Sequence, residues 1–174
     1  MNAGSNAEAA GTTHRTTVEP TSEREIVVTR TFDAPARIVF QAWTTPELFQ
    51  RWWVPKSMPL ALLSYEADFR VGGGYRLVFD VDGTNTMAFF GRYLEVTPPS
   101  RLVWTNDESG EDGAVTTVTL EERGGQTLMV LHELYRSKDV RDAALASRAY
   151  DGMSETFDQL DEVLATLDTG EARP

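Results

Sequence analysis

The sequence predicts an α+β fold, with one curved antiparallel sheet of six or seven strands around a long C-terminal helix. Three observations carry this prediction. Strand-like runs separated by short turns fill residues 61–135. Two short helical segments follow a first strand near the N-terminus. Between Val140 and Leu167, apolar residues recur every three or four positions, as in an amphipathic helix.

Composition narrows the class of protein before any element is assigned. The 174 residues fit one domain, with 41% hydrophobic and 25% charged residues, close to the globular average. The absence of cysteine excludes disulfides and thiolate chemistry. Against 16 basic residues stand 27 acidic ones, and the resulting charge of −11 argues against nucleic acid or anionic lipid as a partner.

The ends of the chain read as tails. Residues 1–23 are mostly small and polar, so we expect them to be disordered and His14 to have no role. The domain is predicted over residues 24–167, and 168–174 form a C-terminal tail. No stretch reaches the ~20 apolar residues of a membrane helix, and the N-terminus lacks the features of a secretory signal. We therefore expect a cytoplasmic protein without a membrane partner.

The first elements are a strand and two helices. Residues 24–32 have strand composition. Asp33 is predicted to cap the next helix, with Pro35 near its first position and apolar residues on one face of 36–43. A second short helix is predicted over 46–53, where Pro46 suits the first helical position.

The middle of the chain is a succession of strands. In the second of them, Tyr75, Leu77, Phe79 and Val81 alternate with more polar residues, which predicts one buried face. The adjacent pair Asp82-Gly83 is a hairpin signal. The six predicted strands are 61–69, 75–82, 87–96, 101–106, 114–122 and 127–135. Short connections between them favour an antiparallel meander.

The last element is predicted as one continuous helix from Val140 to Leu167, which contains no proline and one glycine. A helix of about 25 residues is roughly 37 Å long, enough to lie across a whole sheet. Where a curved sheet and this helix diverge, an apolar cavity can form between them.

Three motifs carry a resemblance to a known family. They are RTFDAPARIVFQAWTTPELFQRWWVP at 30–55, EADFRVGGGYRL at 66–77 and GRYLEVTPPSRLVWTN at 91–106. In this order they resemble the Hsp90-ATPase-activator-like proteins of the START/Bet v 1-like (SRPBCC) superfamily. The family's last helix usually carries Gly-Trp, whereas this chain has Gly152-Met153.

The resemblance implies a helix-grip (Bet v 1/START-like) fold, which agrees with the elements derived above. The superfamily includes lipid and sterol carriers, hormone receptors, polyketide cyclases and co-chaperone domains, so the fold alone does not select a function. Eukaryotic activators contact Hsp90 through a separate N-terminal domain. Only 23 residues precede the fold here, so we do not expect Hsp90 as a partner.

Candidate site residues are those expected to face the cavity. Aromatic rings would stack on an apolar ligand, His132 would hydrogen-bond it, and Arg92 would pair with an acidic group. His132 shares strand parity with Leu128 and Val130, which would point it inward and Glu133 outward. The predicted ligand-binding residues are Phe40, Trp43, Trp53, Tyr75, Phe79, Phe90, Arg92, Trp104, His132, Met153 and Phe157.

The functional prediction is a non-catalytic protein that holds a small hydrophobic ligand in the cavity. An enzyme of the polyketide cyclase/aromatase or hydrolase kind, using His132 to move protons, is one alternative. A co-chaperone-like interaction module, with a filled core and an exposed apolar patch, is another. We expect no metal site, because the second histidine lies in the tail, and we assign no cofactor and no catalytic residue. A homodimer that forms through a strand edge or the outer sheet face is compatible with the sequence.

Overall fold

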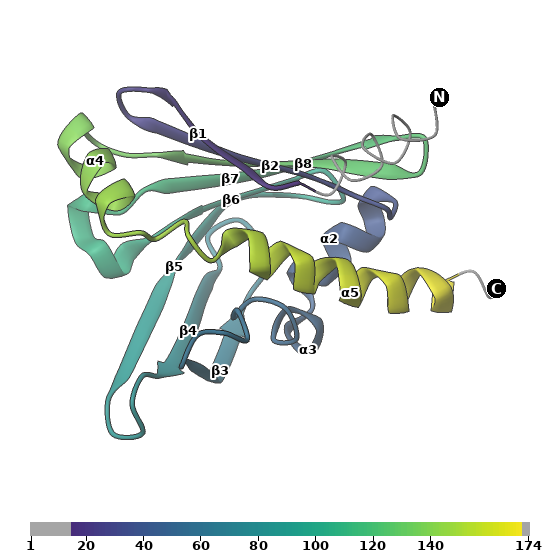
Figure 1. Cartoon of the computed structure of the whole chain (residues 1–174), viewed down its shortest axis with the longest axis horizontal. Helices are drawn as coiled ribbons and strands as arrows, with labels where there is room; N and C mark the ends of the chain where they lie inside the picture. Colours follow the sequence, from purple (N-terminus) through teal and green to yellow (C-terminus); the bar gives the residue numbers. More distant parts are fainter. Residues whose placement is uncertain (1–14, 172–174) are drawn as a thin grey trace, which may run out of the picture.

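The computed structural model describes residues 15–171, with side chains described as far as Leu167. Within these residues, eight strands form one antiparallel sheet in the order β1-β2-β8-β7-β6-β5-β4-β3 (Figure 1). The strands are β1 Thr17–Ser22, β2 Glu25–Phe32, β3 Ala61–Ala67, β4 Gly74–Asp80, β5 Thr86–Thr97, β6 Arg101–Thr105, β7 Val115–Arg123 and β8 Gln126–Leu134. The helices are α2 Ala36–Thr44, α3 Pro46–Phe49, the 3₁₀ helix η1 Asp107–Asp112, α4 Lys138–Ala146 and α5 Met153–Glu171.

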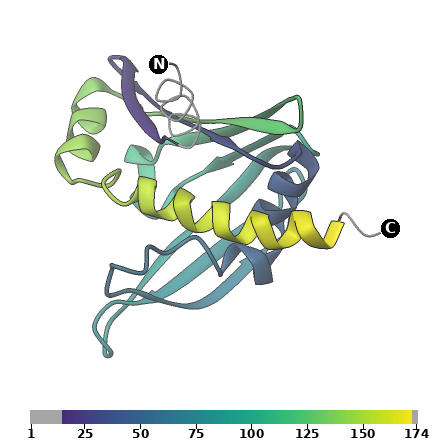
Figure 2. The same cartoon turned by 45° about the vertical axis from the view of Figure 1, so that its right-hand side comes forward.

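The sheet is strongly bent, and α5 lies along its concave side. Strand β5 makes the bend, because residues 86–92 pair with β4 whereas 93–97 pair with β6, with a register shift between Tyr93 and Glu95. In Figure 1, β3, β4 and β5 diverge from the layer formed by β1, β2, β8, β7 and β6. Figure 2 shows α5 crossing the space between these two parts. The predicted helix-grip arrangement is therefore confirmed.

The strand count exceeds the six or seven expected, because part of the predicted N-terminal tail is ordered. Residues Thr17–Ser22 form β1, which pairs with β2 along the sheet edge. Val18 packs against the core, and main-chain pairing to β2 holds a segment whose composition alone did not indicate a strand. His14 and the other residues up to 14 lie outside the described residues.

The two short helices follow β2 as predicted, with a different cap on the first. Pro35 occupies the N-cap position of α2, and the Ala36 N–H donates to Glu122 Oε1 at 2.9 Å. Asp33, the predicted cap, instead accepts a 2.5 Å hydrogen bond from Gln126 Nε2. Glu122 of β7 thus takes the capping role predicted for Asp33. Asp33 instead contacts Gln126, the first residue of β8.

The predicted continuous C-terminal helix is wrong, because α4 and α5 are separated by residues 147–152. Arg148 has a φ of 64°, a left-handed conformation that ends a helix. Tyr150 turns into the core, and its hydroxyl lies 2.6 Å from that of Tyr135. The apolar period continues across the break, so periodicity could not reveal it. Helix α5 also runs past the predicted end at Leu167, to Glu171.

Two sets of contacts hold α5 in place. Arg30, only 2% exposed on the inner face of β2, donates to Asp158 at 2.8 Å and to Asp161 at 2.5 Å. On the other side of the helix, Gln159 Nε2 donates to the carbonyls of Trp52 and Val54 at 3.0 and 2.8 Å. Helix α5 is thereby fixed both to the sheet and to the segment after α3.

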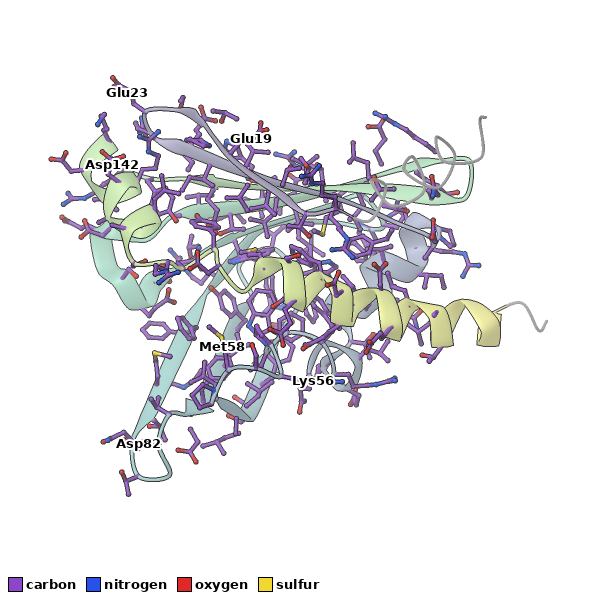
Figure 3. The ribbon with its side chains drawn as sticks, in the orientation of Figure 1. Glu19, Glu23, Lys56, Met58, Asp82 and Asp142 are labelled. Carbon is purple, nitrogen blue, oxygen red and sulfur yellow. The ribbon has the colours of Figure 1, made fainter. Side chains whose placement is uncertain are left out.

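The β4–β5 hairpin extends away from the body of the fold. Figure 3 shows Asp82 at its tip, pointing into solvent. The Asp82 carboxylate accepts hydrogen bonds from the Asn85 side-chain amide and from the backbone N–H groups of Thr84 and Asn85, which hold its pKa well below the usual range. Gly83 has a φ of 87°, as the predicted Asp82-Gly83 turn requires. The same view shows Lys56 and Met58 in the segment that passes beside α5.

Candidate functional site

A cavity of about 860 Å³ lies on the concave side of the sheet, at the end where α4 and α5 separate. Strands β3 to β8 contribute to its wall, and η1, α4 and the first residue of α5 contribute to its rim. The lining side chains are Trp43, Phe49, Trp53, Tyr65, Phe69, Tyr75, Leu77, Phe89, Tyr93, Leu102, Trp104, Asn106, Glu108, Ser109, Asp112, Ala114, Thr116, Leu131, Glu133, Tyr135, Val140, Ala143, Ala144, Ser147, Ala149 and Met153.

One side of the cavity is an aromatic wall, made of Trp43, Phe49, Trp53, Tyr65 and Trp104. The rings contact one another: Phe49 stacks on Trp53 with centroids 4.8 Å apart. Trp43 lies 6.0 Å from Trp53 and 5.9 Å from Trp104. Such rings present large apolar faces at a small entropic cost, because they are held by their neighbours.

Next to this wall lies a polar strip, made of Tyr75, Asn106, Thr116 and Glu133, in which Thr116 is the cross-strand partner of Trp104. Thr116 Oγ1 donates to Glu133 Oε2 at 2.7 Å and accepts from Asn106 Nδ2 at 2.9 Å. Tyr75 donates from its hydroxyl to the Thr105 carbonyl at 2.6 Å. Glu133 Oε1 accepts no hydrogen bond from the described part of the chain. The strip therefore presents one free carboxyl oxygen to the cavity.

Burial sets the protonation of these groups. It raises the pKa of the Glu133 carboxyl, against the opposing effect of the Thr116 hydroxyl. Burial also raises the pKa of Glu108, which accepts a 3.0 Å hydrogen bond from the Phe90 N–H. The pKa of Tyr65 and of Tyr135 rises to about 12, mainly through burial. The tyrosines are thus neutral, and the two carboxyls hold their protons to a higher pH than exposed ones.

The bend of β5 brings Tyr75 close to the end of β6. Gly91 lies where β5 passes β6, and a Cβ there would be 2.1 Å from the Thr105 carbonyl oxygen. Only glycine permits this approach, which also places Thr105 within reach of Tyr75. Beyond Thr105 strand β6 ends, and Glu108 of η1 satisfies the N–H of Phe90.

Five of the predicted site residues line this cavity: Trp43, Trp53, Tyr75, Trp104 and Met153. Phe79 and Phe157 instead line a smaller neighbouring cavity of about 220 Å³, which shares Trp53 and Met153 with the first. Phe40 is buried in the core beneath α2. Three predicted residues, Phe90, Arg92 and His132, do not line either cavity.

The expected inward orientation of His132 is wrong. His132 pairs with Val27 and Thr117 across the sheet and hydrogen-bonds to Glu25 on the outer face. Phe90 and Arg92 also lie on the outer face, where the Arg76 guanidinium carbon is 5.6 Å from the Phe90 ring centroid. Strand β8 has apolar residues at both parities, so alternation alone did not identify its buried face.

Glu133, Glu108, Asn106 and Thr116 were not predicted as site residues. The parity that misplaced His132 also assigned Glu133 to the outer face. A usable signal was present in β7, where Thr116 shares its parity with Val118 and Leu120, and register then places Glu133 opposite Thr116. Within the described residues, no group of three His, Asp or Glu side chains is arranged to hold a metal ion. Nor is any described helix long and apolar enough to cross a membrane.

Solved structures with the same fold come from several bacteria. A Rhodobacter sphaeroides protein is 25% identical, with 88% of this chain and 99% of that chain covered at a TM-score of 0.80. A Nitrosomonas europaea protein is 24% identical, with 86% and 99% covered at 0.76. A Staphylococcus epidermidis protein is 25% identical, with 86% and 94% covered at 0.69. The search of curated proteins gave no significant match.

A family profile covers most of the chain. The profile described as "Activator of Hsp90 ATPase homolog 1-like protein" matches residues 33–165. This span contains α2 through most of α5, and with them every described residue that lines the cavity. The chain therefore belongs to the family of Activator of Hsp90 ATPase homolog 1-like proteins.

Proposed function

We propose that this protein binds a small hydrophobic molecule in the cavity between the sheet and α4 and α5. The observation that carries the proposal is the cavity itself. Its volume of about 860 Å³ lies within the ~300–1,000 Å³ typical of small-molecule sites, and most of its lining side chains are aromatic or aliphatic. A folded chain does not keep such a volume empty of packing side chains without cost, since an unfilled apolar cavity destabilises a protein.

The aromatic wall and the polar strip would contribute differently to binding. The aromatic wall would supply most of the affinity, because each apolar Å² removed from water contributes about 25 cal/mol. The polar strip would set the orientation of the ligand through the Glu133 carboxyl and the Tyr75 hydroxyl. An interaction module would instead be expected to have a filled core, so the cavity favours a binding protein over that alternative.

A catalytic role remains the second candidate, on different residues from those first considered. His132 lies on the outer face and cannot reach the cavity contents. Glu133 lines the cavity with a raised pKa, which is the property of a carboxyl general acid or base. Chromatography of a bound compound after incubation tests this role: conversion in the wild type that is lost in Glu133→Gln supports it, and an unchanged compound refutes it for that compound.

The binding proposal is tested with a neutral fluorescent probe, N-phenyl-1-naphthylamine. We expect saturable fluorescence enhancement and an increase in Tm, since a ligand at 100 times its Kd adds ~2.7 kcal/mol, or about 5–11 °C for a domain of this size. Ala144→Trp, which places an indole into the cavity from α4, should abolish both signals.

Ala146→Trp is the matched control, because Ala146 lies on the same helix but is exposed and outside the cavity lining. This variant should bind the probe like the wild type. Equal loss of binding in both variants would mean that the signal reports the stability of α4, and equal retention in both would place the probe elsewhere. Either result would contradict the proposal.

A further inference from the structure

The cavity has a charge bias that bears on the kind of ligand it accepts. Its lining includes three carboxylic acids, Glu108, Asp112 and Glu133, and among the described lining residues there is no lysine, arginine or histidine. Arg92, which was expected to pair with an acidic ligand group, lies on the outer face, and so does His132. A ligand carboxylate in the cavity would therefore meet acidic side chains and no basic side chain among the described lining residues.

The three acids are not equivalent. Asp112 pairs with Arg136 at 2.6 Å, so its charge is compensated at the rim. Glu108 accepts the Phe90 N–H and is held by the backbone of β5. Glu133 is the most buried of the three acids, and its Oε1 accepts no hydrogen bond from the described residues. Glu133 is thus the group with capacity left for a donor on the ligand.

The aromatic wall adjoins the strip, because Trp104 of β6 pairs with Thr116 of β7. The faces of Trp, Tyr and Phe rings carry partial negative charge, so a cation over a ring is attracted to it, most strongly over Trp. Three of the four tryptophans of the chain, Trp43, Trp53 and Trp104, belong to this wall. The polar strip and the aromatic wall therefore both favour positive charge, the strip through a carboxyl oxygen and the wall through its ring faces.

We propose that the cavity selects an aromatic organic cation: a fused-ring compound that carries a protonated amine, with its rings on the aromatic wall and its ammonium group at Glu133. This inference rests on the proposed function and adds the chemical class of the ligand. The ammonium donates to Glu133 Oε1, while Oε2 keeps the hydrogen bond from Thr116. Before the ligand binds, the buried Glu133 carboxyl holds its proton to a raised pH. When the ammonium binds, the carboxyl ionises and its proton leaves to solvent.

The surroundings of Glu133 determine the pH dependence. Glu108 from η1 and the hydroxyls of Tyr75, Tyr135 and Tyr150 lie near it, and His132 is its neighbour on the opposite face. The acid Glu108 disfavours a second negative charge, and His132 favours it. Affinity for an aromatic amine is therefore expected to increase from pH 5 to pH 8, as Glu133 becomes easier to ionise while the amine stays protonated.

The test uses three probes that differ only in one group: 9-anthracenylmethylamine, 9-anthracenemethanol and 9-anthracenecarboxylate. Their Kd values are measured by fluorescence with the full-length protein at pH 7.5 and low salt. We expect the amine to bind at least about tenfold more tightly than the carboxylate, with the neutral alcohol between them. Glu133→Gln should reduce this amine-to-carboxylate ratio about tenfold, and Glu108→Gln should reduce it less.

Glu121→Gln is the matched control, because it removes the same charge from an exposed position on β7 outside the cavity, and it should keep the wild-type ratio. A carboxylate that binds as tightly as the amine overturns the inference, as does a Glu133→Gln variant that keeps the amine preference. In both cases, binding of the alcohol still supports the proposed function. Failure of all three probes to bind overturns both. If Glu133→Gln does not fold, the wild-type ranking and Glu108→Gln decide the question.

Discussion

Glu133 and His132 are adjacent residues with opposite environments. The period of a strand places one on the cavity side and the other on the outer face, where His132 contacts Glu25. If the predicted face of β8 is exchanged for the observed one, the group in the cavity is the Glu133 carboxyl in place of the His132 imidazole. The chemistry of the site depends on the register of β8 against β2 and β7 more than on which ionisable residues the strand contains.

The raised pKa of Glu133 predicts a pH-dependent stability difference. Because the native pKa lies above the ordinary value of 4.5, the protonated carboxyl stabilises the fold, fully below pH 4.5 and progressively less as pH rises through the native pKa. Glu133→Gln cannot ionise. Its free energy of unfolding relative to wild type should therefore increase with pH, by at most about 1.4 kcal/mol per unit, and level off above the native pKa.

Urea unfolding of both proteins from pH 4.5 to 8 measures this difference. Glu121→Gln, an exposed residue on β7, is the control and should track the wild type. A difference between Glu133→Gln and wild type that stays constant with pH would mean that the Glu133 carboxyl has the same pKa in the folded and unfolded chains.

Gly91 predicts a second effect at the scale of one residue. A Cβ at this position would lie 2.1 Å from the Thr105 carbonyl oxygen, so backbone must move. Gly91→Ala should destabilise the protein by about 3 kcal/mol and lower Tm by roughly 6–12 °C. Gly74→Ala is the control in the neighbouring strand, where the nearest atom is 3.6 Å away and the change should stay within about 0.5 kcal/mol. Equal Tm values for the two variants would show that β5 and β6 can separate freely.

At the scale of elements, the break between α4 and α5 makes room for the cavity. A continuous helix would have carried the stripe from Leu145 to Met153 straight along the sheet. Instead α4 has no buried residue among its nine, and it contributes Ala143 and Ala144 to the rim. Ser147, Ala149 and Met153, at and beyond the break, also line the cavity. The segment 147–152 thus determines how far the rim lies from the sheet.

Arg148 is the strained position of this segment, and its backbone predicts the effect of substitution. A left-handed conformation costs a side-chain-bearing residue ~1–2 kcal/mol, whereas glycine adopts it freely but loses more entropy on folding. Arg148→Gly should therefore be about 0.5–1 kcal/mol more stable than Arg148→Ala. Both variants lose the exposed ion pair to Asp151, so the comparison isolates the backbone. Urea unfolding that ranks the alanine variant as more stable would contradict a left-handed Arg148.

At the scale of the whole molecule, the sequence was sufficient for the fold and for one side of the site. The alternation of Tyr75, Leu77 and Phe79 predicted a buried face that the structure shows. Motifs around Trp43 and Trp53 led to the family and to the aromatic wall. Composition did not reveal β1, because the strand is held mainly by pairing with β2, and Val18 is its one side chain packed against the core. The helix break was hidden because the apolar period continues through it.

The polar strip could not be derived from local pattern for a related reason. Its members come from β4, β7 and β8 and from Asn106 between β6 and η1. Thr116 and Glu133 meet through the register of β7 and β8, whereas the bend of β5 brings Tyr75 to the end of β6. Each was unremarkable in its own segment, and Thr116 and Asn106 carry no titratable group. Such a network is a property of strand order and register, which a single sequence specifies only through the whole set of long-range pairings.

The uneven charge of the molecule predicts how stability responds to salt. With 27 acidic and 16 basic residues, repulsion between acids is spread over the whole surface. The exposed ion pairs oppose it weakly, at ~0–1 kcal/mol each, and the buried Arg30 contacts with α5 are screened less. Adding 0.3 M NaCl should therefore raise Tm by about 2–4 °C, corresponding to ~1 kcal/mol. Potassium chloride at equal ionic strength should have the same effect, because screening depends on ionic strength and not on sodium binding. A decrease in Tm with both salts would mean that attractive pairs outweigh the net repulsion, and an increase with sodium alone would point to a bound cation.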